Sequence, residues 1–346
     1  MRARRIGVAV ALAGAAAAVA AGYGASPGSA KSTTRAGAQG KAFVVLVTDV
    51  NQLNDHGFNQ LAYQGLKRAE KKLGITGAVY QSASAQAYIP NLAQAARKGA
   101  DLVVSVGFDQ AVAVAKVAKQ FPKTHFAIID VDQTTLAGKP KNVEGLIFKE
   151  QEVGYLAGYL AGLVEKRKGG PATIGSVGGQ KQPPVDRYIA GYRAGAKKAD
   201  PSIKLLNTYS QDWVDQAKCK QAALDQISAG ASIVFQVAGG CGLGALDAAK
   251  EKGVWGIGVD ADQSYLGSHV LTSAMKRVDT SVYSTIQQVL AGTFAGGTNA
   301  VFSLKNNGVG LGKISSKVSS ADVAKVKQIA KQIAAGKIAH IPTSVS

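Results

Sequence analysis

Residues 42–73 read AFVVLVTDVNQLNDHGFNQLAYQGLKRAEKKL, and this stretch sets the pattern for the whole chain. It opens with a continuous apolar run rich in β-branched residues, Ala42–Thr48, which predicts a buried strand. After a polar stretch, Phe58–Leu73 carries apolar residues at helical spacing, which predicts a helix. Strand followed by helix then recurs along the chain. Such alternation is typical of a parallel sheet with helices on both faces.

The same criteria locate the remaining elements. Strands are predicted at residues 78–80, 102–106, 126–129, 143–148, 173–177, 203–208, 232–237, 255–259 and 270–274. Helices are predicted at residues 89–96, 111–120, 151–165, 188–198, 216–228, 245–251, 282–290 and 321–335. The chain has 346 residues, which is too long for one ordinary core and suits two doubly wound α/β units of similar size.

The first thirty residues have the features of a signal peptide. Met1–Arg5 is basic, an apolar run extends from Ile6 to about Ala21, and Gly28-Ser29-Ala30 supplies small residues for cleavage. The alternative is a transmembrane anchor, but the run is short of the roughly 20 strongly apolar residues that a span needs. Residues 31–41 are predicted to be a flexible lead-in. We therefore expect a protein exported to the periplasm or the cell exterior, without a lipobox cysteine.

Composition narrows the class of partner. The formal net charge is +18, and hydrophobic residues make up 46% and charged residues 18% of the chain, as in a globular protein. A basic excess can indicate nucleic acid or an anionic envelope surface. The lysines are spread over helix faces without interleaved aromatics, so nucleic-acid binding is not expected.

Only two cysteines are present, Cys219 and Cys241. In an exported chain they are a disulfide candidate, and the alternative is a pair of buried thiols. The four histidines have no metal-ligand spacing, so no metal is predicted. No phosphate-binding loop and no nucleophile elbow are present, and we expect no cofactor.

Polar residues follow the apolar runs, as expected where ligand groups gather at the carboxyl ends of parallel strands. Asp49, Asp130 and Asp260 each come directly after a predicted strand. At Asp130 and Asp260, a carboxylate can accept two hydrogen bonds from a vicinal diol, which suits ribose. The alternatives are helix capping or an interdomain salt bridge. Two carboxylates could also hydrolyse a glycosidic bond, although no second signal supports that.

Three further features could serve a ligand or the fold. The glycines of Val237–Gly244 do not match a dinucleotide fingerprint in register, and they favour close approach of the backbone to a ligand. Trp213 is either a core plug or a platform for a flat ring. Lys276 is either a surface charge or a ligand donor. In the polar stretch before the first helix, Asn54 or Asp55 is expected to cap the helix.

Several ordered motifs together resemble the basic membrane protein family of ABC-transporter substrate-binding proteins, whose best-understood members are purine nucleoside receptors. They lie at residues 49–60, 126–130, 148–162, 188–196, 236–244, 256–263 and 271–277. The resemblance covers about residues 42–342. It implies a type I periplasmic-binding-protein fold, ABC permease and ATPase subunits as partners, and a monomer that binds its ligand without breaking a bond.

The resemblance also implies roles for single residues. It assigns a hydrogen bond to the base to Asn59, ring stacking to Trp213 and the ribose hydroxyls to Asp260. It makes Asp130, Gly240 and Lys276 further ligand contacts. The candidates for the side chain that covers the second face of the base are Leu53, His56 and Phe108. Two features depart from the family: Asn51 and His56-Gly57 replace residues that are often Gly and Lys-Ser, and family members are commonly lipoproteins.

The predicted N-terminal lobe takes residues 42–148 plus 279–295, and the C-terminal lobe takes residues 149–276 plus 300–346. Three chain crossings would form the hinge. The alternatives to a nucleoside receptor are a receptor for another flat ligand such as a flavin, a nucleoside hydrolase that uses Asp130 and Asp260, and a sensor that signals through a membrane partner.

Overall fold

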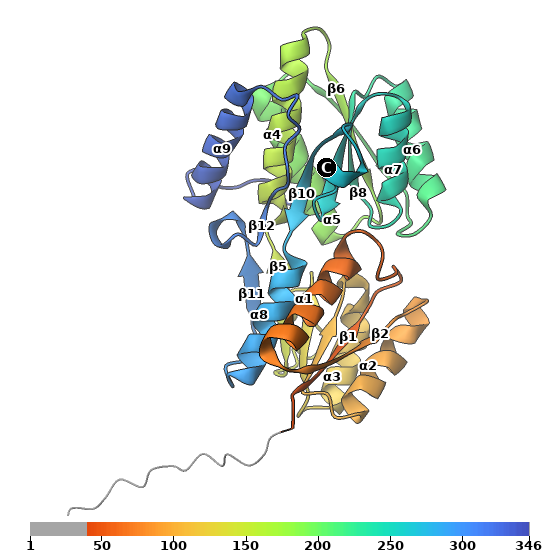
Figure 1. Ribbon diagram of the computed structural model, residues 1–346, viewed down its shortest axis with the longest axis vertical. Coiled ribbons are helices and arrows are strands. Elements are labelled where there is room, and N and C mark those ends of the chain that lie inside the picture. Colours follow the sequence, from red (N-terminus) through yellow and green to blue (C-terminus); the bar gives the residue numbers. More distant parts are fainter. Residues whose placement is uncertain (1–39, 346) are drawn as a thin grey trace, which may run out of the picture. The chain divides into compact units, whose positions relative to one another are not determined.

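The computed structural model of the protein describes residues 40–345. The predicted signal peptide, residues 1–30, and most of the predicted lead-in lie outside the described residues. Within the described part, the chain forms two α/β lobes, each built on a six-stranded sheet (Figure 1). This is the predicted fold class, with two parallel-sheet units.

The first sheet has the strand order β11-β5-β4-β3-β1-β2, and all of its strands run parallel. The strands are β1 (Phe43–Val47), β2 (Thr76–Tyr80), β3 (Leu102–Ser105), β4 (His125–Ile129), β5 (Val143–Phe148) and β11 (Asn299–Phe302). The helices of this lobe are α1 (Phe58–Leu73), α2 (Tyr88–Arg97), α3 (Ala111–Gln120) and α8 (Val278–Leu290).

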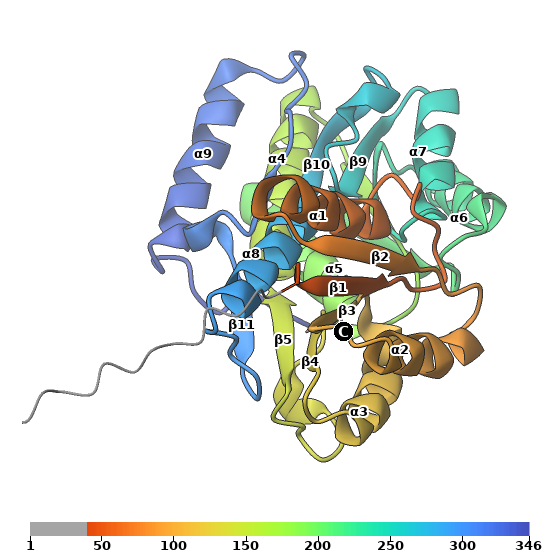
Figure 2. The same cartoon turned by 60° about the horizontal axis from the view of Figure 1, so that its bottom comes forward.

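The alternation of side chains along β1 explains why helices cover both faces of this sheet. Val44 and Leu46 belong to a core cluster that includes residues of α1 and α8. Val45 and Val47 point the other way, into a cluster with residues of α2 and α3. Figure 2 shows these helices in the same lobe as the sheet. A strand buried on both faces therefore reads as a continuous apolar run.

The second sheet has the order β12-β10-β9-β8-β6-β7. The strands are β6 (Thr173–Gly178), β7 (Lys204–Tyr209), β8 (Ile233–Val237), β9 (Trp255–Asp260), β10 (Val270–Lys276) and β12 (Val309–Leu311). The helices are α4 (Glu150–Lys168), α5 (Pro183–Ala199), α6 (Gln216–Ser228), α7 (Gly242–Glu251) and α9 (Ser320–Ala334). Only the edge strand β12 runs antiparallel to its neighbour.

Glycines set the distance between α4 and α5. Gly154 and Gly158 recur at a spacing of one helical turn on the face of α4 that meets α5. A Cβ at Gly158 would collide with the carbonyl oxygen of Tyr192, and one at Gly154 with that of Tyr188. Gly154 and Gly158 therefore allow α4 and α5 to pack closely against each other.

The chain crosses between the lobes three times, as predicted: from β5 to α4, from β10 to α8 and from β11 to β12. α8 returns to the first lobe, where Asp279 lies 3.4 Å from the Arg68 guanidinium of α1. One boundary needs correction. The sequence places the chain from residue 300 in the C-terminal lobe, whereas β11 pairs with β5 in the first sheet. The third crossing therefore follows Phe302.

Candidate functional site

The carboxyl ends of the two sheets meet at a pocket between the lobes. The empty space in it, open solvent at the mouth included, is about 570 Å³. Six of the predicted ligand residues line it: Asp49, Phe108, Asp130, Trp213, Asp260 and Lys276. Asn59 and Gly240 do not line it, although their neighbours Phe58 and Gly239 do.

Asp49 is fixed in the pocket wall by the polar stretch that follows β1. Its carboxylate accepts hydrogen bonds from the Asn51 N–H and from the Asn59 side-chain amide, both at 2.7 Å. Asn59 is fully buried, also donates to Asp55 at 3.1 Å, and accepts from the Asp49 N–H at 3.3 Å. The Asn59 amide is thus occupied within the loop, where it orients Asp49.

Asp55 serves the fold of this stretch. Its carboxylate accepts hydrogen bonds from the backbone N–H groups of Gly57 at 3.0 Å, Asn59 at 2.8 Å and Gln60 at 3.1 Å. These groups lie at the start of α1, where N–H groups have no partner within the helix. This is the capping role predicted for Asn54 or Asp55. Asp55 therefore has a structural role that needs no ligand.

Aromatic side chains from both lobes line the pocket. Trp213 follows β7, and its carbonyl accepts a hydrogen bond of 2.8 Å from the Cys241 N–H. Its ring lies against Gly179, where any Cβ would collide with it. From the other lobe come Phe58, the first residue of α1, and Phe108. Leu53 and His56, the other candidates for the second stacking position, do not line the pocket.

Phe58 was not predicted as a pocket residue, because the start of an amphipathic helix reads as core. Tyr188 on α5 was missed for the same reason, and it also lines the pocket. The available signal for Phe58 was its place in the polar stretch that follows β1. The first helical residue after such a stretch stays at the carboxyl edge of the sheet.

Asp130 and Asp260 occupy equivalent places at the ends of β4 and β9. Both have left-handed backbone conformations, with φ of 73° and 61°. Residues other than glycine rarely adopt this region, and Asp is among those that tolerate it. Backbone strain of this kind clusters at binding sites. Each lobe therefore presents one aspartate to the pocket from a matching turn.

A buried charge network extends from Asp130 behind the pocket. Lys276, the last residue of β10, places its ammonium 2.6 Å from an oxygen of Asp130 and 3.0 Å from an oxygen of Glu150. Arg187 on α5 binds the other oxygen of Glu150 at 2.6 Å. The salt bridge considered as an alternative for Asp130 is therefore present. Glu150 was not predicted, because it reads simply as the start of α4.

The carboxylate of Asp260 makes fewer contacts than that of Asp130, whose two oxygens both contact the Lys276 ammonium. The Asp260 carboxylate accepts a hydrogen bond of 3.3 Å from the Tyr188 hydroxyl. No ion pair within 4.0 Å joins it to a cation among residues 40–345. Since a carboxylate can accept about four hydrogen bonds, Asp260 retains the larger unused capacity for a ligand with hydroxyl groups.

Burial controls the ionisation of the pocket carboxyls. Desolvation raises the pKa of Asp49 and of Asp260 to about 7. Desolvation also raises the pKa of Asp130 to about 6, against the lowering effect of the Lys276 charge. Burial alone would lower the pKa of Lys276, but the neighbouring acids Asp130 and Glu150 outweigh it and raise this pKa. The ammonium therefore stays charged.

Direct hydrogen bonds also join the lobes around the pocket. They run from Gln182 to Asp109 at 2.6 Å, from the Gly240 N–H to Asn51 at 3.4 Å and from Gln263 to the His56 carbonyl at 3.3 Å. Asn51 and His56 are two of the positions that depart from the family pattern. Both residues accept a hydrogen bond from the opposite lobe, and the donor to Asn51 is the Gly240 N–H.

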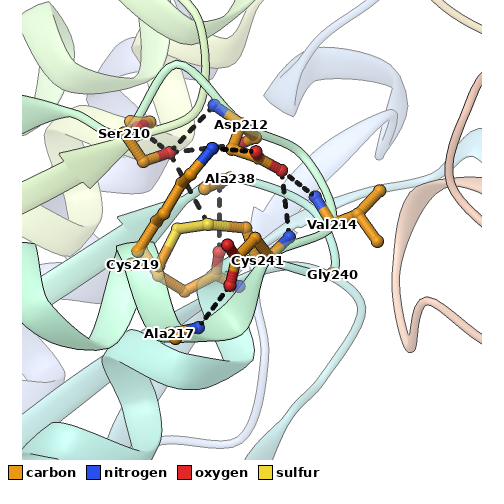
Figure 3. Close-up of a disulfide and its surroundings, with 12 residues drawn as sticks. Ser210, Asp212, Val214, Ala217, Cys219, Ala238, Gly240 and Cys241 are labelled. Atoms are coloured by element: carbon orange, nitrogen blue, oxygen red, sulfur yellow. Dashed lines mark hydrogen bonds and ion pairs between the residues drawn. A yellow bond between two sulfur atoms is a disulfide. The ribbon is translucent and has the colours of Figure 1, made fainter.

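A disulfide supports the Trp213 side of the pocket. The structure forms the predicted bond between Cys219 on α6 and Cys241, which immediately precedes α7 (Figure 3). The Cys241 sulfur lies 3.6 Å from the Ser210 hydroxyl, and its N–H holds the Trp213 carbonyl. The cross-link thus connects the loop that carries Trp213 with the loop that contains Gly239 and Gly240.

Residues 40–345 contain neither a candidate metal site nor a candidate membrane span. No group of three or more His, Cys, Asp or Glu side chains in this range could hold a metal ion. In the same range, no helix has the length and apolar character needed to cross a membrane.

Two α/β lobes joined by three crossings, with a pocket between them, define the class of type I periplasmic-binding proteins. Solved structures agree. An ABC transporter solute-binding protein from Aeropyrum pernix has a TM-score of 0.78 and 26% identity, covering 88% of this chain and 94% of that one. One from Conexibacter woesei has a TM-score of 0.68 and 30% identity, covering 87% and 99%.

The chain belongs to the family described as "ABC transporter substrate-binding protein PnrA-like", whose model matches residues 42–343. The "ABC transporter nucleoside-binding protein BmpA" of Lactococcus lactis is 36% identical, covering 82% of this chain and 85% of its own length. The "CD4+ T-cell-stimulating antigen" of Listeria monocytogenes is 35% identical, with 85% and 87% covered. A protein of Pyrococcus horikoshii named as a lipoprotein is also 35% identical, with 84% and 74% covered.

Proposed function

We propose that this protein captures a purine nucleoside in the pocket between its lobes and delivers it to an ABC importer. The observation that carries the proposal is the composition of one pocket, where Trp213 and Phe58 are joined by Asp130 and Asp260. Flat apolar rings suit a purine base. Carboxylates suit the neighbouring hydroxyls of ribose, since they accept hydrogen bonds and donate none when charged.

Binding is proposed to stabilise the closed arrangement of the lobes. The ligand would be held by Asp130 and Phe58 from the first lobe and by Asp260 and Trp213 from the second. Each hydrogen bond to a charged group contributes about 1.5–3 kcal/mol in a water-excluded site. Since these groups come from two bodies joined by a hinge, a ligand that satisfies all of them favours closure.

The names of relatives support the transport role and an extracytoplasmic location. The Lactococcus lactis relative is named as a nucleoside-binding protein of an ABC transporter, and the Pyrococcus horikoshii relative as a lipoprotein. For this chain we propose export, with ABC permease and ATPase subunits as partners and a monomeric receptor. Its two cysteines, Cys219 and Cys241, are joined to each other.

We further propose that the ligand leaves unchanged. The oxygens of Asp130 are held by Lys276, which disfavours that residue as a proton donor to a glycosidic bond. The hydrolase alternative can be tested directly. Incubation of the protein with inosine, followed by chromatography, would have to yield hypoxanthine and ribose. We expect inosine to be recovered intact.

The deciding experiment is calorimetric titration with adenosine, guanosine, inosine, cytidine and riboflavin, after unfolding and refolding to remove ligand carried through purification. We expect saturable one-to-one binding of at least one purine nucleoside, and its loss in Asp260→Ala. Binding of riboflavin alone would assign the pocket to a different flat ligand. The absence of binding to every nucleoside would refute the nucleoside assignment while leaving the fold and family unaffected.

A further inference from the structure

Glu150 is a buried acid that lies outside the pocket yet contacts a residue of its wall. Its side chain is fully buried at the start of α4, directly after the first crossing between the lobes. One of its oxygens lies 3.0 Å from the ammonium of Lys276, which ends β10 at the second crossing. The other binds Arg187 of α5 at 2.6 Å. Glu150 therefore joins both crossings to the C-terminal lobe.

The network that contains Glu150 is balanced in charge. Asp130 and Glu150 supply two negative charges, and Lys276 and Arg187 supply two positive charges. The Lys276 side chain is 2% exposed, and its ammonium sits between the two carboxylates. Both acids are therefore engaged with it, and no cationic capacity is left for a ligand.

Because the charge of Lys276 is already balanced by this network, the other acids that line the pocket have no cation to offset them. The pocket lining contains four carboxylates, Asp49, Asp109, Asp130 and Asp260, and a single cation, Lys276. A phosphorylated ligand would add negative charge beside them in a water-poor space, where like charges repel strongly. An uncharged ligand rich in hydroxyl groups meets no such penalty.

We propose that Glu150 is a specificity-determining positioning residue: by neutralising Lys276 from behind the pocket, it makes the cleft accept an uncharged nucleoside and reject the corresponding nucleoside monophosphate. This inference rests on the proposed function for its choice of ligand. Without Glu150, Lys276 would be shared only with Asp130, and Arg187 would lose its partner. Two cationic groups would then face a single acid, which is an arrangement that attracts phosphate.

A different role for Glu150 would be purely structural, because removing one partner of a buried pair destabilises a fold whatever the pair does. The two roles differ in what restores the wild-type behaviour. If charge balance matters, the double variant Glu150→Gln/Arg187→Gln, which removes one charge of each sign, should again reject phosphate. If only packing matters, the double variant should be no better than the single one.

The test compares the dissociation constants of inosine and inosine 5′-monophosphate by calorimetry in four proteins: wild type, Glu150→Gln, Glu150→Gln/Arg187→Gln, and the control Glu165→Gln. Glu165 lies on the same helix, is buried and pairs with Lys168, so the control removes the same charge away from the pocket. We expect the preference for inosine to fall about tenfold or more in Glu150→Gln only. An unchanged preference in Glu150→Gln, or an equal fall in the double variant, overturns the proposal.

Inorganic phosphate gives a readout that does not depend on nucleoside binding. We expect 10 mM phosphate at constant ionic strength to raise the melting temperature of Glu150→Gln and to leave those of the wild type and Glu165→Gln unchanged. This result would stand even if no nucleoside bound, so failure of the proposed function can be told apart from failure of this inference. The absence of a phosphate effect on Glu150→Gln would count against it.

Should Glu150→Gln not fold, Arg187→Gln tests the same charge argument with the opposite sign. It removes a positive charge and leaves Glu150 to Lys276 alone, so the pocket becomes more negative. The preference for inosine over its monophosphate should then increase, again by about tenfold. A decrease or no change in Arg187→Gln would refute the role of charge balance.

Discussion

At the scale of single residues, the pocket combines aromatic rings, which make apolar contacts, with carboxylates, which need hydrogen-bond donors. Trp213 is only partly buried and rests on Gly179, so one face of the indole remains for a ligand. Asp130 and Asp260 sit in strained left-handed turns, which a strand end would not adopt for stability alone. Because each of these features belongs to one residue, single substitutions can test the role of each residue in binding.

Replacing Trp213 with Ala should weaken nucleoside binding by about 10- to 100-fold, since stacking of a base on an aromatic ring contributes about 1–3 kcal/mol. The measurement is calorimetry, supported by quenching of tryptophan fluorescence. The only other tryptophan, Trp255, begins β9 at the end remote from Asp260. Trp255→Phe should keep both the affinity and the quenching. Equal losses in the two variants would show that the effect is not stacking.

The pocket carboxyls predict opposite effects of pH on stability and on binding. The pKa values of Asp49 and Asp260 are raised to about 7 and that of Asp130 to about 6, well above the value of about 3.9 in an unfolded chain. Between pH 4 and 7, the folded state therefore binds more protons than the unfolded state. The contribution of these groups to stability increases as the pH falls through this range.

Ligand hydroxyl groups, in contrast, donate to the charged carboxylates. Affinity should therefore fall as the pH drops below 7, by up to about tenfold per pH unit for each carboxylate that must be charged. Melting temperatures and calorimetric dissociation constants at pH 8, 7, 6 and 5 would test both trends. Parallel loss of stability and affinity on acidification would contradict this assignment of the raised pKa values.

At the scale of elements, the cross-link and the helix contacts hold the pocket loops. The Cys219–Cys241 bond closes a segment of 22 residues and lies beside the loops of Trp213 and Gly240. The double variant Cys219→Ser/Cys241→Ser should lose about 3 kcal/mol of unfolding free energy and also bind the nucleoside more weakly. Denaturant unfolding and calorimetry measure the two effects. Lower stability with unchanged affinity would show that other contacts suffice to hold Trp213.

Close packing of α4 on α5 makes a second prediction at this scale. Gly158→Ala should destabilise the protein by about 1–3 kcal/mol, because the added methyl group meets the Tyr192 carbonyl. Alanine favours a helix over glycine by about 1 kcal/mol, so the sign of the change is informative. Gly310→Ala in β12 is the control, since nothing lies within 4 Å of a Cβ there. A stabilised Gly158→Ala, judged by its melting temperature, would mean that α4 and α5 separate easily.

Long elements with a clear period could be predicted from the sequence, and short edge strands could not. The bounds predicted for α1, α3, α6 and β5 are those of the structure. β11 and β12 were missed, because four and three residues are too few to show a period and their pairing depends on distant strands. A similar limit applies to the site. Predicted residues that follow long strands, such as Asp130 and Asp260, line the pocket. Glu150 could not be predicted, because its contact with Lys276 joins segments far apart in sequence.

At the scale of the whole molecule, ligand and hinge act on the same contacts. The lobes touch through Gln182 and Asp109, and through Asn51 and Gly240, both next to the pocket. The buried network of Lys276 and Glu150 lies at the crossings themselves. Bending at the crossings would therefore break the rim contacts first, while the network near the axis is preserved. A ligand that bridges the lobes should shift this equilibrium toward closure.

Energy transfer between dyes on the two lobes can test closure. Val112 in the first lobe is 79% exposed and Val214 in the second is 50% exposed, so cysteines placed there should accept dyes with little cost to the fold. We expect transfer efficiency to rise when inosine is added to Val112→Cys/Val214→Cys, with the midpoint at the calorimetric dissociation constant. The control pair Val112→Cys/Leu290→Cys lies within the first lobe and should give no change. If the interlobe pair is also unchanged although inosine binds, the lobes are closed before the ligand arrives, and capture must proceed without a hinge motion.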